Sequence, residues 1–591
     1  MSQNVFSIVT SLRRASGPVN IRNAILTIQE FSAIDDEYRR RLAAGGCIAS
    51  ICIAMKKYAS DAGVQGAGCG ALGNFADHNQ ENRMEISSVG GIVDIISAMQ
   101  SHPQNAWVQQ CACGALGSLG SDNEDIKIEI AHAGGLYDIF VAMQFHDTNI
   151  LVQRCACRAL MNLAVNDINS NEIFTENNGI GVVCQLMRNF PNDAEIQRYC
   201  CGTLMNVAVY FDNSHIIADN NGITLILNAM RAHQSDVHVQ QYSCAGLMNL
   251  ASTLNNNNIF ADNDTFALIC TAMREHQEKA EIQQYGCGAF MKFAVNQNYS
   301  ERIIAEGGVT LVLDAIKNHA TDVNVQIRGC GAVMNLSLRE NNTVPIVELG
   351  GIDLILSTMQ RYPLNATIQQ YTCATITYLA LNTDNRDTIV AKGGIPFILS
   401  AVEQHANDVN AQLHGCAALM NVAVDDNNTL LIVEADGIRV ILAVMERHPS
   451  DTGLQKYTCA ALMLVAVTVE NRNQIFTCGG LGFILLVMET CAYDADVSQY
   501  GCGAIMNLAL NEDISDLIVG GIGIGFILSA IAANVFHAGV QQNSIGALRN
   551  LAVNETHRTT IVETIISSIE VPTYSDDVKQ HFRAALESVM L

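Results

Sequence analysis

The sequence has little charge and almost no tryptophan. Lys, Arg, Asp and Glu make up only 15% of the 591 residues, and the acids outnumber the bases to give a formal net charge of −25. Trp107 is the one tryptophan. A protein that binds nucleic acid needs a basic face, so this balance argues against DNA or RNA as a partner. It favours solubility or basic protein partners, and composition alone does not choose between the two.

Targeting and catalytic motifs are also scarce. Arg13 and Arg14 follow the apolar positions of the first segment instead of preceding them, which is unlike a secretory signal peptide. Ser2 stands where N-myristoylation needs glycine. The GxGxxG match at 68–73 lies inside a helical pattern with no strand before it, so it is not a dinucleotide fingerprint. We therefore expect no catalytic site and no cofactor.

One repeated stretch organises the chain. Near-copies of residues 499–508, QYGCGAIMNL, recur along almost the whole length. The counterparts of Cys502 lie 43 or 44 residues apart, and Ile545 takes the same place one step later. The other reference positions are Cys69, Cys113, Cys157, Cys201, Cys244, Cys287, Cys330, Cys373, Cys416 and Cys459. This spacing is typical of stacked repeats, and predicts one solenoid where length alone suggests about four domains.

The recurring stretch has the periodicity of an amphipathic helix. With the reference cysteine as position zero, Cys at 0, Leu or Ile at +3, Met at +4 and Ala at +7 fall on one stripe, which we expect to face the core. Tyr at −2, Gly or Ala at +1 and Asn at +5 form a second stripe. The asparagines are Asn74, Asn162, Asn206, Asn249, Asn335, Asn421, Asn507 and Asn550. The tyrosines are Tyr199, Tyr242, Tyr285, Tyr371, Tyr457 and Tyr500.

Each unit adds two more helices to the recurring one. A short helix is followed by a glycine turn such as Gly90-Gly91, where glycine permits the left-handed conformation, and then by a second apolar helix. Asp or Asn is expected to cap the third helix. The pattern predicts an all-α, right-handed α-solenoid of about 12–13 repeats. Residues 1–60 would form a degenerate capping repeat, 61–555 the continuous array, and 556–591 the C-terminal capping helices.

Eleven of the 20 cysteines occupy the reference position. Equivalent positions of stacked helices lie about 8–10 Å apart, which is too far for a disulfide. We therefore expect buried, reduced thiols, which indicate a reducing compartment such as the cytoplasm. Neither the CxC pairs at 111–113 and 155–157 nor the recurrent histidines can converge on a metal. Those histidines should satisfy carbonyls at the end of the second helix. They are His102, His146, His233, His276, His319, His405 and His448.

The uncharged run from Leu517 to Phe536 is long enough to resemble a membrane-spanning helix. Its glycines and the segment Phe526-Ile527-Leu528 nevertheless fall in register with the repeat. We therefore expect a turn and a buried helix in this run, and no insertion into a membrane.

The three-helix unit, with its glycine turn and a last helix ending Ala-Leu-x-Asn-Leu-Ala, resembles the armadillo repeat of β-catenin and importin-α. Residues 159–164 and 547–552 show this ending, and the resemblance covers roughly residues 19–590. It implies a concave groove lined by third helices, in which the eight asparagines and six tyrosines bind a partner segment. The other interpretation is that the asparagines bond the neighbouring repeat and the tyrosines pack on the next helix.

By this resemblance the chain is expected to be a non-enzymatic protein–protein interaction scaffold or adaptor, with basic segments among its candidate partners. The alternative is an armadillo-type exchange factor or chaperone of small GTPases with polybasic tails, which the acidic charge favours. A nuclear transport adaptor is less favoured, because importin-α carries tryptophan where this chain has Gly, Ala or Arg158. The asparagine series is also interrupted, at Ser118, Lys292, Tyr378 and Leu464. It is least broken from Tyr199 to Tyr285, where we place the binding site.

Overall fold

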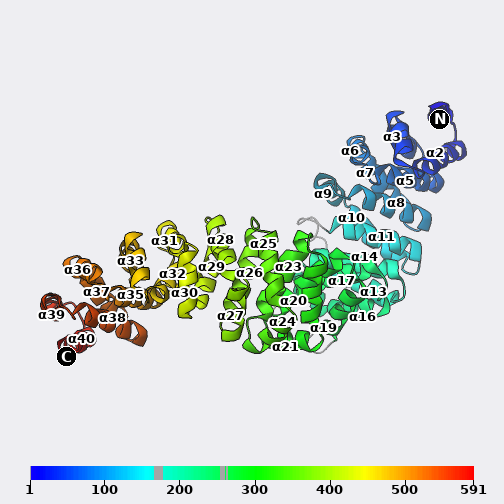
Figure 1. Ribbon diagram of the computed structural model, residues 1–591. Coiled ribbons are helices and arrows are strands. Elements are labelled where there is room, and N and C mark those ends of the chain that lie inside the picture. The colour runs from blue at the N-terminus through cyan, green and yellow to red at the C-terminus, as the bar shows by residue number, and fades with distance from the viewer. Residues whose placement is uncertain (1, 165–177, 253–259, 261–263) are drawn as a thin grey trace. The chain divides into compact units, whose positions relative to one another are not determined.

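The computed structural model describes residues 2–164, 178–252, 260 and 264–591. Within these ranges the regular structure is α-helical throughout, without a strand. The all-α solenoid expected from the three-helix unit is therefore confirmed. The chain divides into two compact units, Met1–Phe293 (unit 1) and Ala294–Leu591 (unit 2), which are described one at a time (Figure 1).

Unit 1 begins with α1 (Ser2–Arg14) and then repeats a short first, a longer second and a long third helix. The first helices are α3 (Asp36–Ala44), α6 (Gln80–Ser88), α9 (Glu124–His132) and α15 (Phe211–Asp219). The second helices are α4 (Cys47–Lys57), α7 (Gly91–Ser101), α10 (Gly135–Phe145), α13 (Gly179–Asn189), α16 (Gly222–Ala232) and α19 (Thr265–Glu275). The third helices are α2 (Pro18–Ser32), α5 (Ala62–Ala76), α8 (Ala106–Leu119), α11 (Ile150–Leu163), α14 (Ala194–Val207), α17 (Val237–Leu250) and α20 (Ala280–Phe293).

Unit 2 repeats the same order six times and closes with two longer helices, α39 (Glu555–Glu570) and α40 (Asp576–Met590). The first helices are α21 (Gln297–Ala305), α24 (Glu340–Glu348), α27 (Thr383–Ala391), α30 (Asp426–Glu434), α33 (Val469–Thr477) and α36 (Glu512–Gly520). The second helices are α22 (Gly308–Asn318), α25 (Gly351–Arg361), α28 (Gly394–Gln404), α31 (Gly437–Arg447), α34 (Gly480–Thr490) and α37 (Gly523–Ala533). The third helices are α23 (Val323–Leu336), α26 (Ala366–Leu379), α29 (Val409–Val422), α32 (Thr452–Val465), α35 (Ala495–Leu508) and α38 (Ala538–Leu551).

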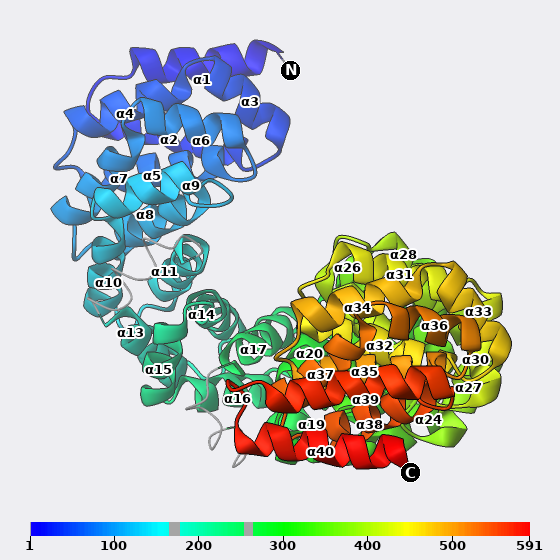
Figure 2. The same ribbon diagram turned by 90° about the vertical axis from the view of Figure 1, so that its left-hand side faces the viewer.

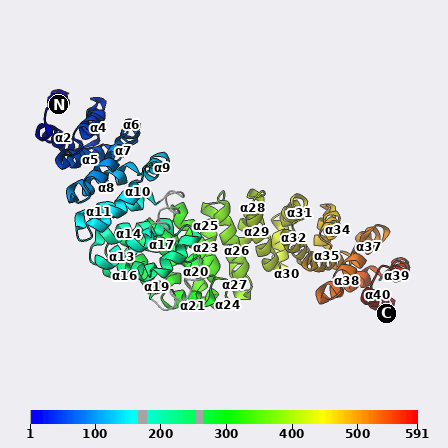
Figure 3. The ribbon, with the colours of Figure 1, turned by 180° about the vertical axis from the view of Figure 1, so that it is seen from behind.

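Within each unit, every third helix packs on the third helix of the next repeat, and in unit 2 this stacking runs from α23 to α38 (Figure 3). The reference cysteine and the Leu or Ile at +3 lie at the centre of this packing, as Cys201 and Leu204 show with no exposed surface. Burying a leucine fully stabilises a fold by about 1.5–3 kcal/mol. No single repeat can bury both sides of its third helix, so this stabilisation depends on stacking.

The turns follow the sequence signals. Gly90 has φ of +81° and directly precedes α7, and glycines hold the same left-handed place in six other repeats. Asn178, Asn221 and Asp436 replace glycine there, which is consistent with the tolerance of Asn and Asp for positive φ. Most third helices start on a side-chain cap, as in α17, where the Asp236 carboxylate accepts from the Val239 amide at 2.9 Å, whereas α2 starts after Gly17 without one.

The two ends of the chain carry helices outside the regular order. At the start, α1 packs against α2, α3 and α4, while α2 packs on α5 as one third helix packs on another (Figure 2). At the other end, α40 packs against α37, α38 and α39. These contacts are those that capping helices would make, because they cover a face that another repeat would otherwise cover.

Among the described residues no single helix is both long and apolar enough to cross a membrane. The apolar run that begins at Leu517 is divided between α36 and α37, which pass that test only as a pair and meet at a bend of 72°.

Candidate functional site

The expected binding face centres, in unit 1, on a hollow of about 370 Å³ between α11, α14 and α17. Its lining includes Met161, Asn162, Met205, Asn206 and Tyr242. The structure thus brings Asn206 and Tyr242, from the stretch where the two series are least interrupted, together with Asn162 of the preceding repeat. Ser121, Asp122 and Lys127 complete the lining, so the hollow offers thioethers, amides and one aromatic ring beside a hydroxyl and two charged groups.

The asparagines tie neighbouring third helices together. Asn206 Nδ2 donates to the Met161 carbonyl at 2.9 Å, and Asn249 Nδ2 donates to the Met205 carbonyl at 3.0 Å. The same bond to the preceding repeat is made by Asn74, Asn162, Asn421, Asn507 and Asn550. The inter-repeat interpretation therefore holds at these positions. The bond uses one N–H, and the Asn206 carbonyl oxygen accepts no hydrogen bond within the described ranges, so the amide can also bind a partner.

The tyrosines at −2 are half-buried in every repeat that carries one. A Cβ added to Gly202 would lie 3.3 Å from the Tyr242 ring, so this ring packs on the preceding third helix. His238 stacks on its other side with ring centroids 6.1 Å apart, and burial raises the pKa of the Tyr242 hydroxyl. The Arg198 guanidinium lies 4.6 Å from the Tyr199 ring centroid. The tyrosines therefore contribute to packing between repeats while leaving part of each side chain exposed.

Methionine at +4 was expected in the core, and in most repeats this is wrong. The half-exposed methionines are Met161, Met205, Met248, Met334, Met420, Met463 and Met506, whereas Met291 is buried. Position +4 lies at about 40° past position 0, at the border of the stripe formed by 0, +3 and +7 and next to position +1, where a small residue such as Gly202 is buried beneath the methionine of the preceding repeat. The methionines therefore lie on the same face as the asparagines.

Glycine at +1 has a structural reason. A Cβ added to Gly202 would lie 2.5 Å from Met161 Sδ, and Gly503 and Gly546 are approached in the same way by Met463 and Met506. The methionine of one repeat thus occupies the space above the glycine of the next. No room remains there for the aromatic slot that a tryptophan at +1 would form.

A series of buried glutamines, which the sequence analysis did not single out, lies at position −4 of the third helices. Gln240 is 2% exposed, and its Nε2 donates to the carbonyls of Met230 at 3.0 Å and His233 at 2.9 Å at the end of α16. Equivalent pairs of bonds are made by Gln65, Gln109, Gln153, Gln197, Gln283, Gln326, Gln369, Gln455 and Gln541. The sequence signal that could have revealed this series is the recurrence of glutamine at a position that the helical periodicity places in the core.

The recurrent histidines lie at the ends of the second helices, as expected, but most bridge repeats instead of bonding their own helix. His102 Nε2 lies 2.8 Å from the Ala59 carbonyl of the preceding repeat, and His233 Nε2 lies 2.8 Å from the Pro191 carbonyl. The same contact is made by His146, His276, His405 and His448. The carbonyls of each histidine's own helix are satisfied by the buried glutamine, which explains the difference.

The cysteines are free, and every reference cysteine is buried. Burial raises the pKa of the Cys201 and Cys244 thiols to about 12, so both stay protonated at neutral pH. One pair of cysteines lies closer than the distance expected between reference cysteines of neighbouring repeats. Cys200, which is not a reference residue, has its Sγ 3.8 Å from the Sγ of Cys157. Over the ranges that the structure describes, no cluster of three or more His, Cys, Asp or Glu side chains could hold a metal ion.

Comparison with known proteins agrees with the fold. Residues 173–344 match the family model for the LRRK2 ARM repeat. A solved structure from work on a phosphorylation switch that controls the interaction between cadherin and β-catenin is similar, with TM-score 0.65 and 14% identity over 85% of this chain and 98% of that one. An engineered protein matches with TM-score 0.48 and 19% identity over 78% of this chain and 98% of its own. No curated protein sequence matches.

Proposed function

We propose that this chain, whose three-helix units have the armadillo fold, is a non-enzymatic scaffold that holds segments of partner proteins on the exposed face of its third helices. In unit 1 we place the site at the hollow between α11, α14 and α17. The observation that carries the proposal is the row of half-exposed methionines beside the asparagines. In unit 1 the row runs through Met161, Met205 and Met248, and partly exposed apolar side chains in neighbouring repeats are typical of an interaction surface.

The chemistry of this face suits a peptide segment. Thioethers are flexible and polarisable, so Met161 and Met205 can adapt to aliphatic or aromatic side chains. The Asn206 carbonyl oxygen, which accepts no hydrogen bond among the described residues, can accept a main-chain N–H of the segment while the amide nitrogen keeps its bond to the Met161 carbonyl. A similar solved structure concerns the binding of cadherin by β-catenin, which supports a protein segment as the class of ligand.

A regulator of small GTPases with polybasic tails is the second candidate. The net charge of −25 favours it, because basic tails associate faster with an acidic surface. A nuclear transport adaptor has less support, since Met161 occupies the place above Gly202 where an aromatic slot would stand. We propose the cytoplasm as the location, on the basis of the many free thiols.

Photo-crosslinking tests the proposed site. A benzophenone amino acid is placed at Tyr242 in one variant and, as a control, at Asn228 on the exposed side of α16 in another. In native lysate, Tyr242 should crosslink to a discrete protein segment that mass spectrometry can map, and Asn228 should not. Equal, unspecific crosslinking from both positions would contradict a site on the third-helix face.

A further inference from the structure

Unit 2 exposes an aliphatic side chain directly after most of its third helices, at position +8. Leu381, Val424, Val467, Leu510 and Val553 are between 45% exposed, for Val467, and 77% exposed, for Val553. An exposed carboxylate follows each of them within three residues, and these are Asp384, Asp426, Glu470, Glu512 and Glu555. We call these ten residues the aliphatic–acidic ridge. One aliphatic group and one acid thus recur in five consecutive repeats.

The fold does not require an aliphatic residue at +8. In unit 1 the corresponding positions are Asp77, Ser121 and Ser252 beside Val165 and Val209, so polar residues are accepted at this place in the repeat. A buried role cannot explain the ridge either, because its side chains are exposed. Neighbouring exposed aliphatic residues on a soluble protein indicate a surface that another molecule covers.

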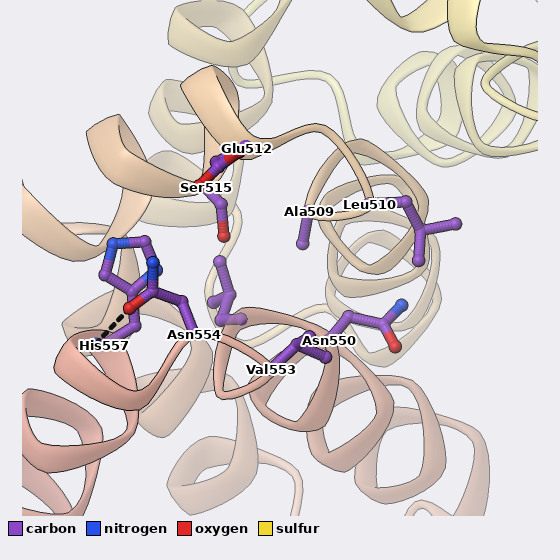
Figure 4. Close-up of a pocket in the computed structure, with 9 residues that line it drawn as sticks. Ala509, Leu510, Glu512, Ser515, Asn550, Val553, Asn554 and His557 are labelled. Carbon is purple, nitrogen blue, oxygen red and sulfur yellow. Dashed lines mark hydrogen bonds between the residues drawn. The ribbon is translucent and has the colours of Figure 1, made fainter.

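A hollow of about 360 Å³ lies between ridge residues of two consecutive repeats, at the turns that follow α35 and α38. It is lined by Leu510, Val553, Ala509 and Leu551 and by the polar side chains of Glu512, Ser515, Asn550, Asn554 and His557. Figure 4 shows Glu512 on one side of the hollow and Val553 facing it from the other. An aliphatic side chain placed there would be covered by Leu510 and Val553, with a carboxylate near its base.

We propose that the aliphatic–acidic ridge docks an amphipathic α-helix of a partner protein, with aliphatic residues against the ridge aliphatics and Lys or Arg beside its carboxylates. Five carboxylates of one sign attract a basic segment and repel an anionic lipid surface. Stacked repeats lie about 10 Å apart, and a helix rises about 10.5 Å over seven residues. A helix with one aliphatic residue per heptad would therefore meet one ridge residue in each repeat.

The side chains at the ridge turns favour a helix over an extended peptide. Asn511 Oδ1 accepts from the Ile514 amide at 3.1 Å, and Asn554 Oδ1 accepts from the Thr556 amide at 2.9 Å. These caps are already used by their own helices. An extended main chain needs hydrogen-bonding partners, whereas a helix satisfies its backbone internally. The hollow is also lined by Asn550 of the third-helix face, so the ridge borders that face, and this proposal rests on the scaffold function proposed above and deepens it by naming the chemistry of the partner.

A designed peptide tests the ridge on the full chain. The probe is a fluorescent helix of about 21 residues with leucine once per heptad and lysine on either side of it, and the control carries glutamate in place of lysine. Fluorescence anisotropy should show saturable binding of the lysine peptide and at least ten-fold weaker binding of the glutamate peptide. Circular dichroism should show that the lysine peptide gains helix when it binds.

Variants locate the binding. Val424→Ser with Val467→Ser and Leu510→Ser should weaken the lysine peptide at least ten-fold, and Val209→Ser, an exposed +8 position in unit 1, should not. Asp426→Asn with Glu470→Gln and Glu512→Gln should weaken it and flatten its salt dependence. Equal binding to the wild type and the serine triple variant would overturn the ridge proposal. Ridge-dependent binding of phosphatidylserine vesicles, without peptide binding, would also overturn it.

A further variant distinguishes binding at the ridge from binding at the third-helix face. Met161→Gln with Met205→Gln should leave binding of the lysine peptide unchanged, because neither residue belongs to the ridge. If this pair abolishes peptide binding and the serine triple variant does not, the peptide sits on the third-helix face, and the ridge proposal fails while the scaffold proposal stands.

Discussion

Replacing Gln240 by leucine removes the side chain that closes the end of α16. Leucine is similar in size and suits a site that is 2% exposed, so the packed volume changes little. The carbonyls of Met230 and His233, however, lose donors that lie 3.0 and 2.9 Å away. A buried group left without a hydrogen bond costs about 1–3 kcal/mol. The His233 carbonyl still accepts from the Asp236 amide at 3.0 Å, so only the Met230 carbonyl loses its donor without replacement, and we expect the free energy of unfolding around α16 to fall by about 1–3 kcal/mol.

Hydrogen exchange is the suitable assay, because a repeat array can open locally and a global melting curve can miss the event. Gln241→Leu is the matched control, since Gln241 is the half-exposed neighbour on the same helix. Amides at the end of α16 and the start of α17 should lose protection in Gln240→Leu and keep it in Gln241→Leu. Equal protection in the two variants would refute the account of the buried glutamines.

Other perturbations test the packing. The double variant Asn206→Ala with Asn249→Ala should lower the melting temperature, because each lost hydrogen bond reduces the free energy of unfolding by about 0.5–1.5 kcal/mol. An unchanged melting curve would show that these hydrogen bonds do not stabilise the fold. Gly246→Ala should stabilise the fold by up to about 1 kcal/mol, because the nearest heavy atom to the added Cβ lies 3.7 Å away. Gly117→Ala should not stabilise it, because the added Cβ would lie 3.0 Å from the backbone of the next third helix. Denaturant titrations compare the two. Burial raises the pKa of the reference thiols in the folded state, so the free energy of unfolding should be constant below the ordinary thiol pKa of about 8.5 and should fall as the pH rises from there to about 12. In native buffer at pH 7.5, the exposed Cys478 should react with thiol reagents before the buried cysteines do. Rapid labelling of all cysteines, or stability independent of pH above 9, would contradict their burial.

The three-helix unit and its turns could be predicted from the sequence because each depends on local chemistry. The reference cysteine marks the core stripe, Gly90 marks a left-handed turn, and Asp236 marks a helix start; the structure has all three. The predicted boundaries at residues 60 and 555 stay predictions, as do the cytoplasmic location and the partner.

Contacts between repeats were harder to predict. A helical wheel gives only the direction of each side chain, so Met205 was placed in the core although it lies beyond its edge. Which carbonyl His233 meets depends on the stacking distance between repeats, which one repeat alone does not encode. The +8 residues such as Leu510 were missed because exposure has no signature in the periodicity of a helix. An alignment of the repeats, in which Leu or Val recurs at +8 through unit 2 but alternates with Asp and Ser in unit 1, would have found them.

The central claim is that the third-helix face between α11 and α17 holds a partner segment. The most direct measurement is the affinity of the full chain, by isothermal titration calorimetry, for the segment mapped by crosslinking from Tyr242. Met161→Gln with Met205→Gln replaces two thioethers of the hollow by side chains of similar shape. The account predicts affinity at least ten-fold weaker, about 1.4 kcal/mol or more, with an unchanged melting temperature. Unchanged affinity in this variant would contradict it.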